Sequence, residues 1–301
     1  MAGDYSHPAR RRRRVMLPAT LFLATCASTF WAGATDFNPV EYMRSFEAAG
    51  LAIFRHWRPG LLYMAAVLAI LLTHEMGHFV TTLRYRIPAS LPFFIPMPVA
   101  PFGTLGAVIG MEGSRADRRQ MFDQGLAGPL AGLVVALPVT WIGIHQLPAQ
   151  PVAGSGICFY SPLIFQLMID FFRPDYPTGS LLYLNQFNPF LMAGYVGMLI
   201  TGLNMLPIGQ LDGGHVSYAL FGRGAHVLAR MLLIGAILFV LIYEKWLWVL
   251  MIVIVTLIGT DHPPTADDRA PLGPLRRILG LASLTIPVFC FHPFVIKEFF
   301  P

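Results

Sequence analysis

Three ionisable side chains interrupt an otherwise apolar segment at residues 59–83. They are His74, Glu75 and His78, and together they form the pattern HExxH. On a helix, residues four apart share one face, so both imidazoles can bind the same metal ion. Zinc suits such ligands and lowers the pKa of a bound water to about 7. Glu75 is then a candidate general base, and the pattern predicts metal-assisted hydrolysis.

The apolar surroundings make a chance occurrence of the motif a poor explanation. In that alternative, the histidines only bond a neighbouring helix or reach toward the membrane surface. Each polar group in a membrane helix needs a compensating partner, and ionisable groups there usually serve a function. We therefore treat His74, Glu75 and His78 as a candidate zinc site within a lipid bilayer.

The composition is that of a polytopic membrane protein. Charged residues make up 12% of the chain and hydrophobic residues 55%, whereas a soluble domain is about 25% charged. The net charge is +5, but the arginines flank apolar segments, which is typical of cytoplasmic loops. We expect no nucleic-acid partner. Cys26, Cys158 and Cys290 are scattered and indicate neither a disulfide framework nor a metal cluster.

Six apolar segments can cross a membrane: 15–34, 59–83, 123–146, 189–211, 229–260 and 277–292. Glu244-Lys245 can divide the fifth into two helices, so we expect six or seven crossings in an all-α polytopic fold. Residues 1–14 are expected to form a basic cytoplasmic N-terminus. Residues 15–301 then form a single membrane domain, with the metal-site core at about 59–220. The first segment is interpreted as a retained signal-anchor helix, although cleavage after residues 32–34 stays possible.

The arginine positions predict the orientation. If Arg10–Arg14 lie in the cytoplasm, seven crossings place every later arginine cluster there as well. His74 and His78 then lie toward the cytoplasmic end of their helix. Residues 148–188 form the one sizeable external connection, in which 157–172 is expected to lie at the membrane interface.

A further apolar segment, residues 87–111, cannot be a regular helix because it contains five prolines. Non-helical backbone at membrane depth must be buried in protein or line a wet cavity. We expect a re-entrant β-type loop beside the metal site, with a short hairpin at 104–111; the alternative is an ordinary cytoplasmic loop. A strand edge at 103–111 can hold an unwound peptide, which makes Gly103 and Gly106 candidate substrate-binding residues.

A catalytic zinc site needs a third protein ligand, and none is close in sequence. Residues 79–111 contain no Asp, Glu, His or Cys. Pro207 and Gly209 break the fourth segment just before Asp212, on the side of the membrane predicted for the HExxH motif. Asp212 is therefore the preferred third ligand. The candidates compared were Asp123, His145, Asp212 and His215.

The pairing of HExxH with N-x-x-P-x-x-x-L-D-G at residues 204–213 resembles the site-2 protease family of intramembrane zinc metalloproteases. Residues 123–132 are similar to the small-residue helix between the two metal helices of that family. Residues 91–111 are similar to its re-entrant β-loop. Residues 261–265, Asp-His-Pro-Pro-Thr, resemble a C-terminal stretch of bacterial and plastid members. The resemblance covers residues 59–292.

This resemblance implies a zinc endopeptidase that cuts transmembrane proteins, with one zinc per chain. It implies His74, His78 and Asp212 as ligands, Glu75 as general base and Asn204 as a residue that holds the substrate backbone. The external connection of about 40 residues is too short for a PDZ domain, which needs a domain of roughly 80–100, so we expect the short form of the family.

A multi-pass protein of a bacterial cytoplasmic membrane is expected, with the active site toward the cytoplasm; the oligomeric state is left open. The alternative function is a zinc-binding transporter or scaffold without proteolytic activity. His215 would be the fourth ligand that closes such a structural site.

Overall fold

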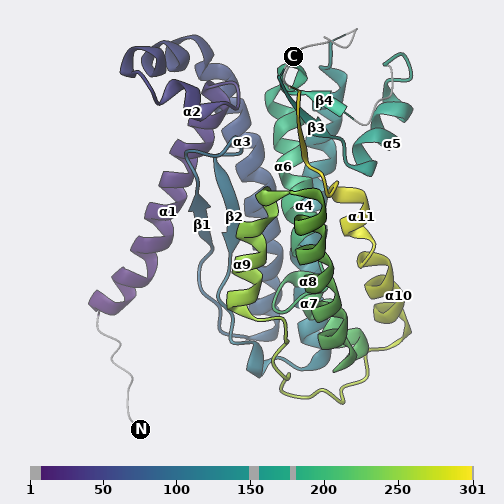
Figure 1. Cartoon of the computed structure of the whole chain (residues 1–301). Coiled ribbons are helices and arrows are strands. Elements are labelled where there is room, and N and C mark those ends of the chain that lie inside the picture. Colours follow the sequence, from purple (N-terminus) through teal and green to yellow (C-terminus); the bar gives the residue numbers. More distant parts are fainter. Residues whose placement is uncertain (1–7, 149–155, 177–180, 300–301) are drawn as a thin grey trace.

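The computed structural model describes residues 8–148, 156–176 and 181–299 (Figure 1). Within these ranges the protein is a bundle of helices with two small sheets. Helix α3 (Phe46–Tyr85) packs against α1 (Pro8–Ala34), α4 (Arg118–His145) and α6 (Pro189–Asn204). Helix α4 also packs against α6 and α7 (Asp212–Phe221), so α3 and α4 form the centre that positions the motifs.

Helix α3 carries the HExxH motif and is longer than the predicted segment 59–83. Its first turn is capped by Ser45, whose hydroxyl accepts a hydrogen bond from the Ala48 N–H. The helix is kinked at His56, where φ is −118°. Pro59 lies three residues later; a proline removes one helical hydrogen bond and crowds the preceding turn, which favours a kink there. The helix ends where Arg86 turns left-handed, with φ 56°.

In the described part of the chain, four helices are long and apolar enough to cross a membrane: Val15–Ala34, α3, α4 and α8 (Gly224–Tyr243). Helix α6 and the stretch Trp246–Ile258 are apolar but shorter. The protein is therefore a mostly helical membrane protein, as predicted. The predicted count of six or seven crossings is not confirmed by helix length.

The last two predicted membrane segments, 229–260 and 277–292, are each divided into two helices. The segment 229–260 divides at Glu244, where φ is 53°, into α8 and α9 (Val249–Ile258), joined by a 3₁₀ turn at Trp246–Trp248. The predicted division is confirmed. The segment 277–292 is not one helix, because α10 (Pro274–Ser283) ends before α11 (Ile286–Cys290). Pro287 has no N–H to donate to the carbonyl of Ser283, so the first helix cannot continue.

The predicted β-type loop is present, but its pairing differs from the prediction. Strands β1 (Phe93–Pro96) and β2 (Thr104–Val108) form an antiparallel hairpin, so 104–111 pairs with an earlier strand instead of folding on itself. The register shifts between Phe94 and Pro96, opposite Gly106, whose φ is +105°. Such a left-handed position in a bulge favours glycine. Figure 1 shows the hairpin between α1 and the rest of the bundle.

A second sheet, which the sequence did not predict, adds to the mostly helical fold. Strands β3 (Gly156–Tyr160), β4 (Leu181–Tyr183) and β5 (Ile296–Phe299) pair antiparallel in the order β4-β3-β5. The segment 157–172, predicted to lie at the interface, is β3 followed by α5 (Leu163–Phe172). The short elements are α2 (Pro39–Tyr42) and the 3₁₀ turns Gly113–Arg115 and Leu184–Gln186.

The largest buried apolar cluster joins α3, α4, α6 and the second sheet. Tyr195 of α6 lies within it, with its ring edge-on to Phe159, Phe165 and Phe187. Aromatic side chains bury large areas in this arrangement, so they hold the helices in a defined register.

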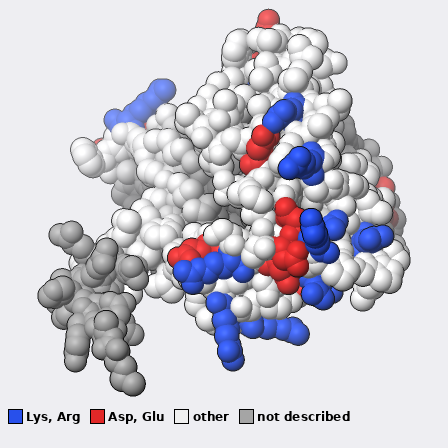
Figure 2. All heavy atoms as spheres, turned by 90° about the horizontal axis from the view of Figure 1, so that it is seen from below, with Lys and Arg blue, Asp and Glu red and all other residues white. Residues whose placement is uncertain are grey.

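Charged side chains gather at the end of the bundle where α3 ends and α4 begins. Figure 2 looks at this lower end and shows Lys, Arg, Asp and Glu close together on it. The loops at this end are 112–119 and 259–273. They are joined by a backbone hydrogen bond from the Arg118 N–H to the Asp267 carbonyl. We call this end of the molecule the charged end; long apolar helices lead away from it.

Candidate metal centre

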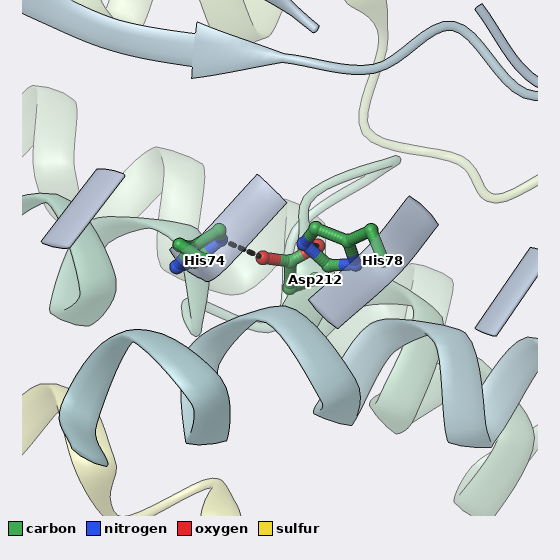
Figure 3. Close-up of side chains that lie close together, drawn as sticks. All are labelled: His74, His78 and Asp212. Atoms are coloured by element: carbon green, nitrogen blue, oxygen red, sulfur yellow. Dashed lines mark hydrogen bonds and ion pairs between the residues drawn. The ribbon is translucent and has the colours of Figure 1, made fainter. Parts of the chain in front are cut away.

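His74, His78 and Asp212 converge on one point in the interior (Figure 3). Their candidate ligand atoms all lie within 4.8 Å of one another. His74 Nε2 is 3.2 Å from Asp212 Oδ2, and His78 Nε2 is 3.3 Å from Asp212 Oδ1. Both imidazoles are buried. The sequence expectation for these three residues agrees with this geometry.

Asp212 reaches the centre because the chain turns sharply before it. Helix α6 ends at Asn204, and Gly209 is left-handed with φ +54°. Asp212 is the first residue of α7, where a carboxylate suits the positive end of the helix dipole. A methyl group on Gly213 would collide with the Met205 carbonyl, and one on Gly214 with the Gly209 carbonyl. The two glycines after Asp212 therefore allow this turn to close.

A glycine face on α4 allows α3 to approach closely. A methyl group built on Gly128 would collide with the His78 ring, and one on Gly132 would lie 3.1 Å from His74 Nδ1. On the facing side of α3, a methyl group on Gly77 would lie 2.5 Å from the Ala127 carbonyl oxygen of α4. The small residues of segment 123–132 thus leave room for the two imidazoles.

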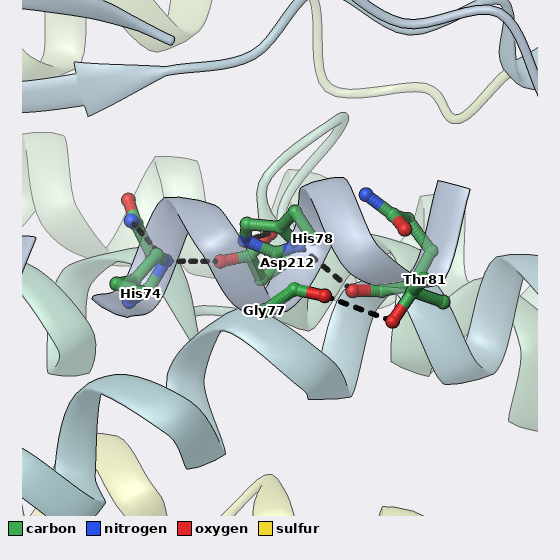
Figure 4. Close-up of polar contacts among 7 residues, drawn as sticks. His74, Gly77, His78, Thr81 and Asp212 are labelled. Atoms are coloured by element: carbon green, nitrogen blue, oxygen red, sulfur yellow. Dashed lines mark hydrogen bonds and ion pairs between the residues drawn. The ribbon is translucent and has the colours of Figure 1, made fainter. Parts of the chain in front are cut away.

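Hydrogen bonds orient the His78 ring. Its Nδ1 lies 2.9 Å from the Gln124 carbonyl, which can only accept, so Nδ1 carries the proton and Nε2 is free toward Asp212. Such a bond from the second nitrogen is typical of metal-ligating histidines. Thr81, one turn later, donates to the Gly77 carbonyl at 2.9 Å (Figure 4).

The residues fit a zinc ion. Two imidazoles and one carboxylate form a ligand set of a catalytic zinc site, which leaves a position for water or substrate. The side-chain Oε1 of Gln124 is buried and has no hydrogen-bond partner among the described residues. A buried acceptor without a donor is costly. Gln124 lines the cavity beside the three candidate ligands, so a water held in that cavity would supply the missing donor.

A cavity of about 380 Å³ opens onto the three candidate ligands. Glu75 and Asn204 line it, as the sequence predicts. The Asn204 amide nitrogen lies 3.5 Å from His74 Nε2. Residues 107–109 of the hairpin line one wall, and residues 254–255 of α9 line another.

The other predicted substrate-binding residues lie elsewhere. Gly103 packs against α1, where its carbonyl accepts a hydrogen bond of 2.6 Å from the Ser28 hydroxyl. Its N–H donates to the Ala100 carbonyl, so both of its backbone groups have partners. Gly106 lies in the bulge of β2 beside Ile200. Neither is among the residues that line the cavity, whereas the adjacent residues 107–109 are.

The rejected ligand candidates have other partners. Arg276 donates to both carboxylate oxygens of Asp123, at 2.8 and 2.9 Å, and the Tyr85 hydroxyl donates to the same carboxylate. This cluster ties α10 and the end of α3 to α4. His145 packs against Trp141 at the other end of α4, with ring centroids 4.6 Å apart.

Two residues near the site escaped the sequence reasoning. Gln124 was passed over in favour of Asp123, although an amide in an apolar helix is itself a signal of function. His262 belongs to the Asp-His-Pro-Pro motif and lies 2.7 Å from His215, which lines the cavity. The sequence shows the motif but not this contact, because the two histidines are 47 residues apart.

Comparison with known proteins agrees with the site. The family model of Peptidase family M50 matches residues 62–242. The "Probable zinc metalloprotease EGY1, chloroplastic" of Oryza sativa subsp. japonica is 29% identical over 245 residues, covering 75% of this chain and 39% of that protein. The protein of the same name from Arabidopsis thaliana is 28% identical over 294 residues, which cover 91% of this chain and 52% of that protein. The "Probable zinc metalloprotease EGY2, chloroplastic" of Arabidopsis thaliana is 28% identical over 176 residues, which cover 58% of this chain and 30% of that protein. No solved structure matches the chain.

The family match covers more than half of the chain, so the chain belongs to peptidase family M50, the site-2 protease family that the sequence motifs resemble. The chain spans about half the length of these curated relatives, or less. Zinc is the metal that the family and the ligand set imply.

Proposed function

We propose that this chain is an intramembrane zinc endopeptidase that hydrolyses peptide bonds within or next to transmembrane helices of other proteins. The observation that carries the proposal is the convergence of the HExxH pair with Asp212 in a cavity inside an apolar helix bundle. Membrane proteins are the substrates that such a family implies. The identity of the substrate is open.

In this mechanism His74, His78 and Asp212 hold the zinc. When bound, zinc polarises the scissile carbonyl and acidifies the attacking water. The Glu75 carboxylate lines the same cavity, takes the proton of that water and passes it to the leaving amine. The Asn204 amide holds the substrate backbone beside His74.

The hairpin offers a surface for the unwound substrate. A peptide bond in a helix is already hydrogen-bonded, so the substrate helix must open before it is cut. The first sheet has two strands, and within the described residues the outer edge of β2 has no strand partner. Residues 107–109 of this region line the cavity, so a substrate added to the edge would pass the metal centre.

Topology and location are part of the proposal. The Lys and Arg side chains at the end shown in Figure 2 support the proposal that this end faces the cytoplasm, or the equivalent stroma in a plastid. The charged end also supports seven crossings within one membrane domain, 15–301, preceded by a basic N-terminus. The bacterial cytoplasmic membrane stays a prediction, since the curated relatives are chloroplastic.

The rival function, a zinc-binding transporter or scaffold, needs a closed site. His215 is not in the group of candidate ligands, and it is bonded to His262 instead. Three ligands and an open cavity favour hydrolysis.

The test uses purified protein in liposomes with a single-span substrate. Zinc-loaded wild-type protein is expected to cut it; chelated protein and Glu75→Gln are not, because an amide cannot accept the proton. A substrate left whole by zinc-loaded wild-type protein, or cut equally by Glu75→Gln, rules out the proposed mechanism.

A further inference from the structure

A buried group of side chains lies behind Asp212 and has no part in the mechanism above. His215 lies one turn after Asp212 on α7, and its Nδ1 is 2.7 Å from His262 Nε2. His262 belongs to the segment between α9 and α10, which crosses the lower end of the bundle (Figure 1). This segment is anchored beside the Asp212 turn, because the Gly209 N–H donates to the Thr260 carbonyl at 3.1 Å.

The His262 ring is held on all sides. It is 4% exposed and stacks on Tyr218, with ring centroids 4.4 Å apart and planes at 13°. Its Nδ1 lies 2.5 Å from the Pro263 carbonyl. Its own carbonyl accepts a hydrogen bond of 3.1 Å from His226. Burial lowers the pKa of His262, which favours the neutral ring.

These contacts determine where the protons lie on both rings. The Pro263 carbonyl can only accept, so Nδ1 of His262 carries its proton and Nε2 is an acceptor. His215 must then donate from Nδ1 to His262. In the neutral His215 ring, Nε2 has no proton. Among the described residues that nitrogen has no hydrogen-bond partner, and His215 lines the metal cavity.

We propose that His215 is a further catalytic residue, whose Nε2 accepts a hydrogen bond from a peptide N–H of the bound substrate, and that His262 is a positioning residue that imposes this tautomer. The inference rests on the proposed proteolytic function. It gives the motif at residues 261–264 a role, because the Asp-His-Pro-Pro segment supplies both the His262 ring and the carbonyl that orients it.

Two substitutions of His215 separate the two ring nitrogens. The amide of His215→Asn lies near the place of Nδ1 and can still donate to His262, but it has no group at the place of Nε2. The longer His215→Gln carries its amide oxygen near Nε2 and can still accept from the substrate. We expect kcat/KM to fall about tenfold in His215→Asn, as for one lost buried hydrogen bond, and about threefold or less in His215→Gln.

His262→Phe keeps the stack on Tyr218 and removes the acceptor for His215. Alone it should lower kcat/KM. Added to His215→Asn it should cause no further loss, because the tautomer no longer matters once Nε2 is gone. If His262 had only a structural role, the double variant would instead show both decreases in kcat/KM, one from each substitution. His145→Asn, which changes a histidine at the far end of α4, is the matched control and should behave as wild type.

All variants are compared in the same liposome assay, with zinc content and thermal unfolding measured beside the rates. The inference requires that zinc content stay at the wild-type level. It is overturned if His215→Asn cuts as fast as wild type, if His215→Gln is as impaired as His215→Asn, or if His215→Asn loses zinc. Absence of cleavage by zinc-loaded wild-type protein would instead refute the proposed function, and the inference with it.

Discussion

The structure around the three proposed ligands brings their side chains to one point. His78 donates from Nδ1 to the Gln124 carbonyl, and Asp212 is held at the start of α7 by a glycine turn. His74 is backed by Gly132 of α4. In the proposed site, zinc would therefore bind to two rings and a carboxylate that already converge on one point.

Zinc content tests these assignments. Purified wild-type protein should carry about one zinc per chain, and His74→Ala or Asp212→Ala should lose most of it, since each removes one of three protein ligands. Metal analysis after gel filtration gives the stoichiometry. His145→Ala is the matched control and should keep its zinc. Full occupancy in Asp212→Ala would show that another residue is the third ligand.

At the residue scale the sequence alone selects the three proposed ligands, which the structure brings together. The HExxH spacing is local, and Asp212 could be chosen because a broken helix placed it at the right depth. Gln124 and His262 could not be assigned, because their roles depend on contacts with residues far away in the chain. The contact of Gly103 with Ser28 of α1 is likewise not visible in a motif.

At the scale of elements, the approach of α4 to α3 decides whether the site can form. Gly128 faces His78 and Gly132 faces His74, so side chains at these positions would occupy the space of the imidazoles. The small residues of segment 123–132 therefore leave the space that the two imidazoles occupy.

Gly128→Ala should therefore weaken zinc binding with little loss of helix. The added methyl group displaces the His78 ring, and a disturbed ligand orientation costs about 10–100-fold in metal affinity. Zinc competition with a chromophoric chelator measures the change. Gly235→Ala on α8 is the control, since its methyl group meets no described atom within 4 Å. Equal affinity in both variants would contradict this packing argument.

Elements with local signals were predicted, and those formed by distant pairing were not. The break at Glu244 follows from polar residues within an apolar segment. The strand partner of residues 104–108 lies across a turn rich in prolines, and β5 joins β3 from the far end of the chain. Such pairings depend on the tertiary fold, so periodicity alone does not reveal them.

At the scale of the whole molecule, charged side chains gather at the end where α3 ends and α4 begins, which Figure 2 shows from below. The long apolar helices lead away from this end. HExxH lies near this end, because His78 is seven residues before the end of α3, a rise of about 10 Å on a helix.

Cysteine labelling tests the orientation. Ser114 is exposed at the charged end, and Asn185 is exposed in the 3₁₀ turn Leu184–Gln186 before α6. In a bacterial host, Ser114→Cys should react with an impermeant reagent only after the membrane is opened, whereas Asn185→Cys should react in spheroplasts. Protein without an added cysteine supplies the background. The reverse pattern would place the charged end outside.

The central claim is that peptide bonds are cut within the membrane by a zinc site built from His74, His78 and Asp212, with Glu75 as the base. Its most direct test is the mass of the fragments released from a single-span substrate in liposomes. Zinc-loaded wild-type protein should yield fragments that end inside the apolar segment, and Glu75→Gln should yield none. Fragments that end only in the water-exposed flanks, or identical fragments from Glu75→Gln, would contradict the claim.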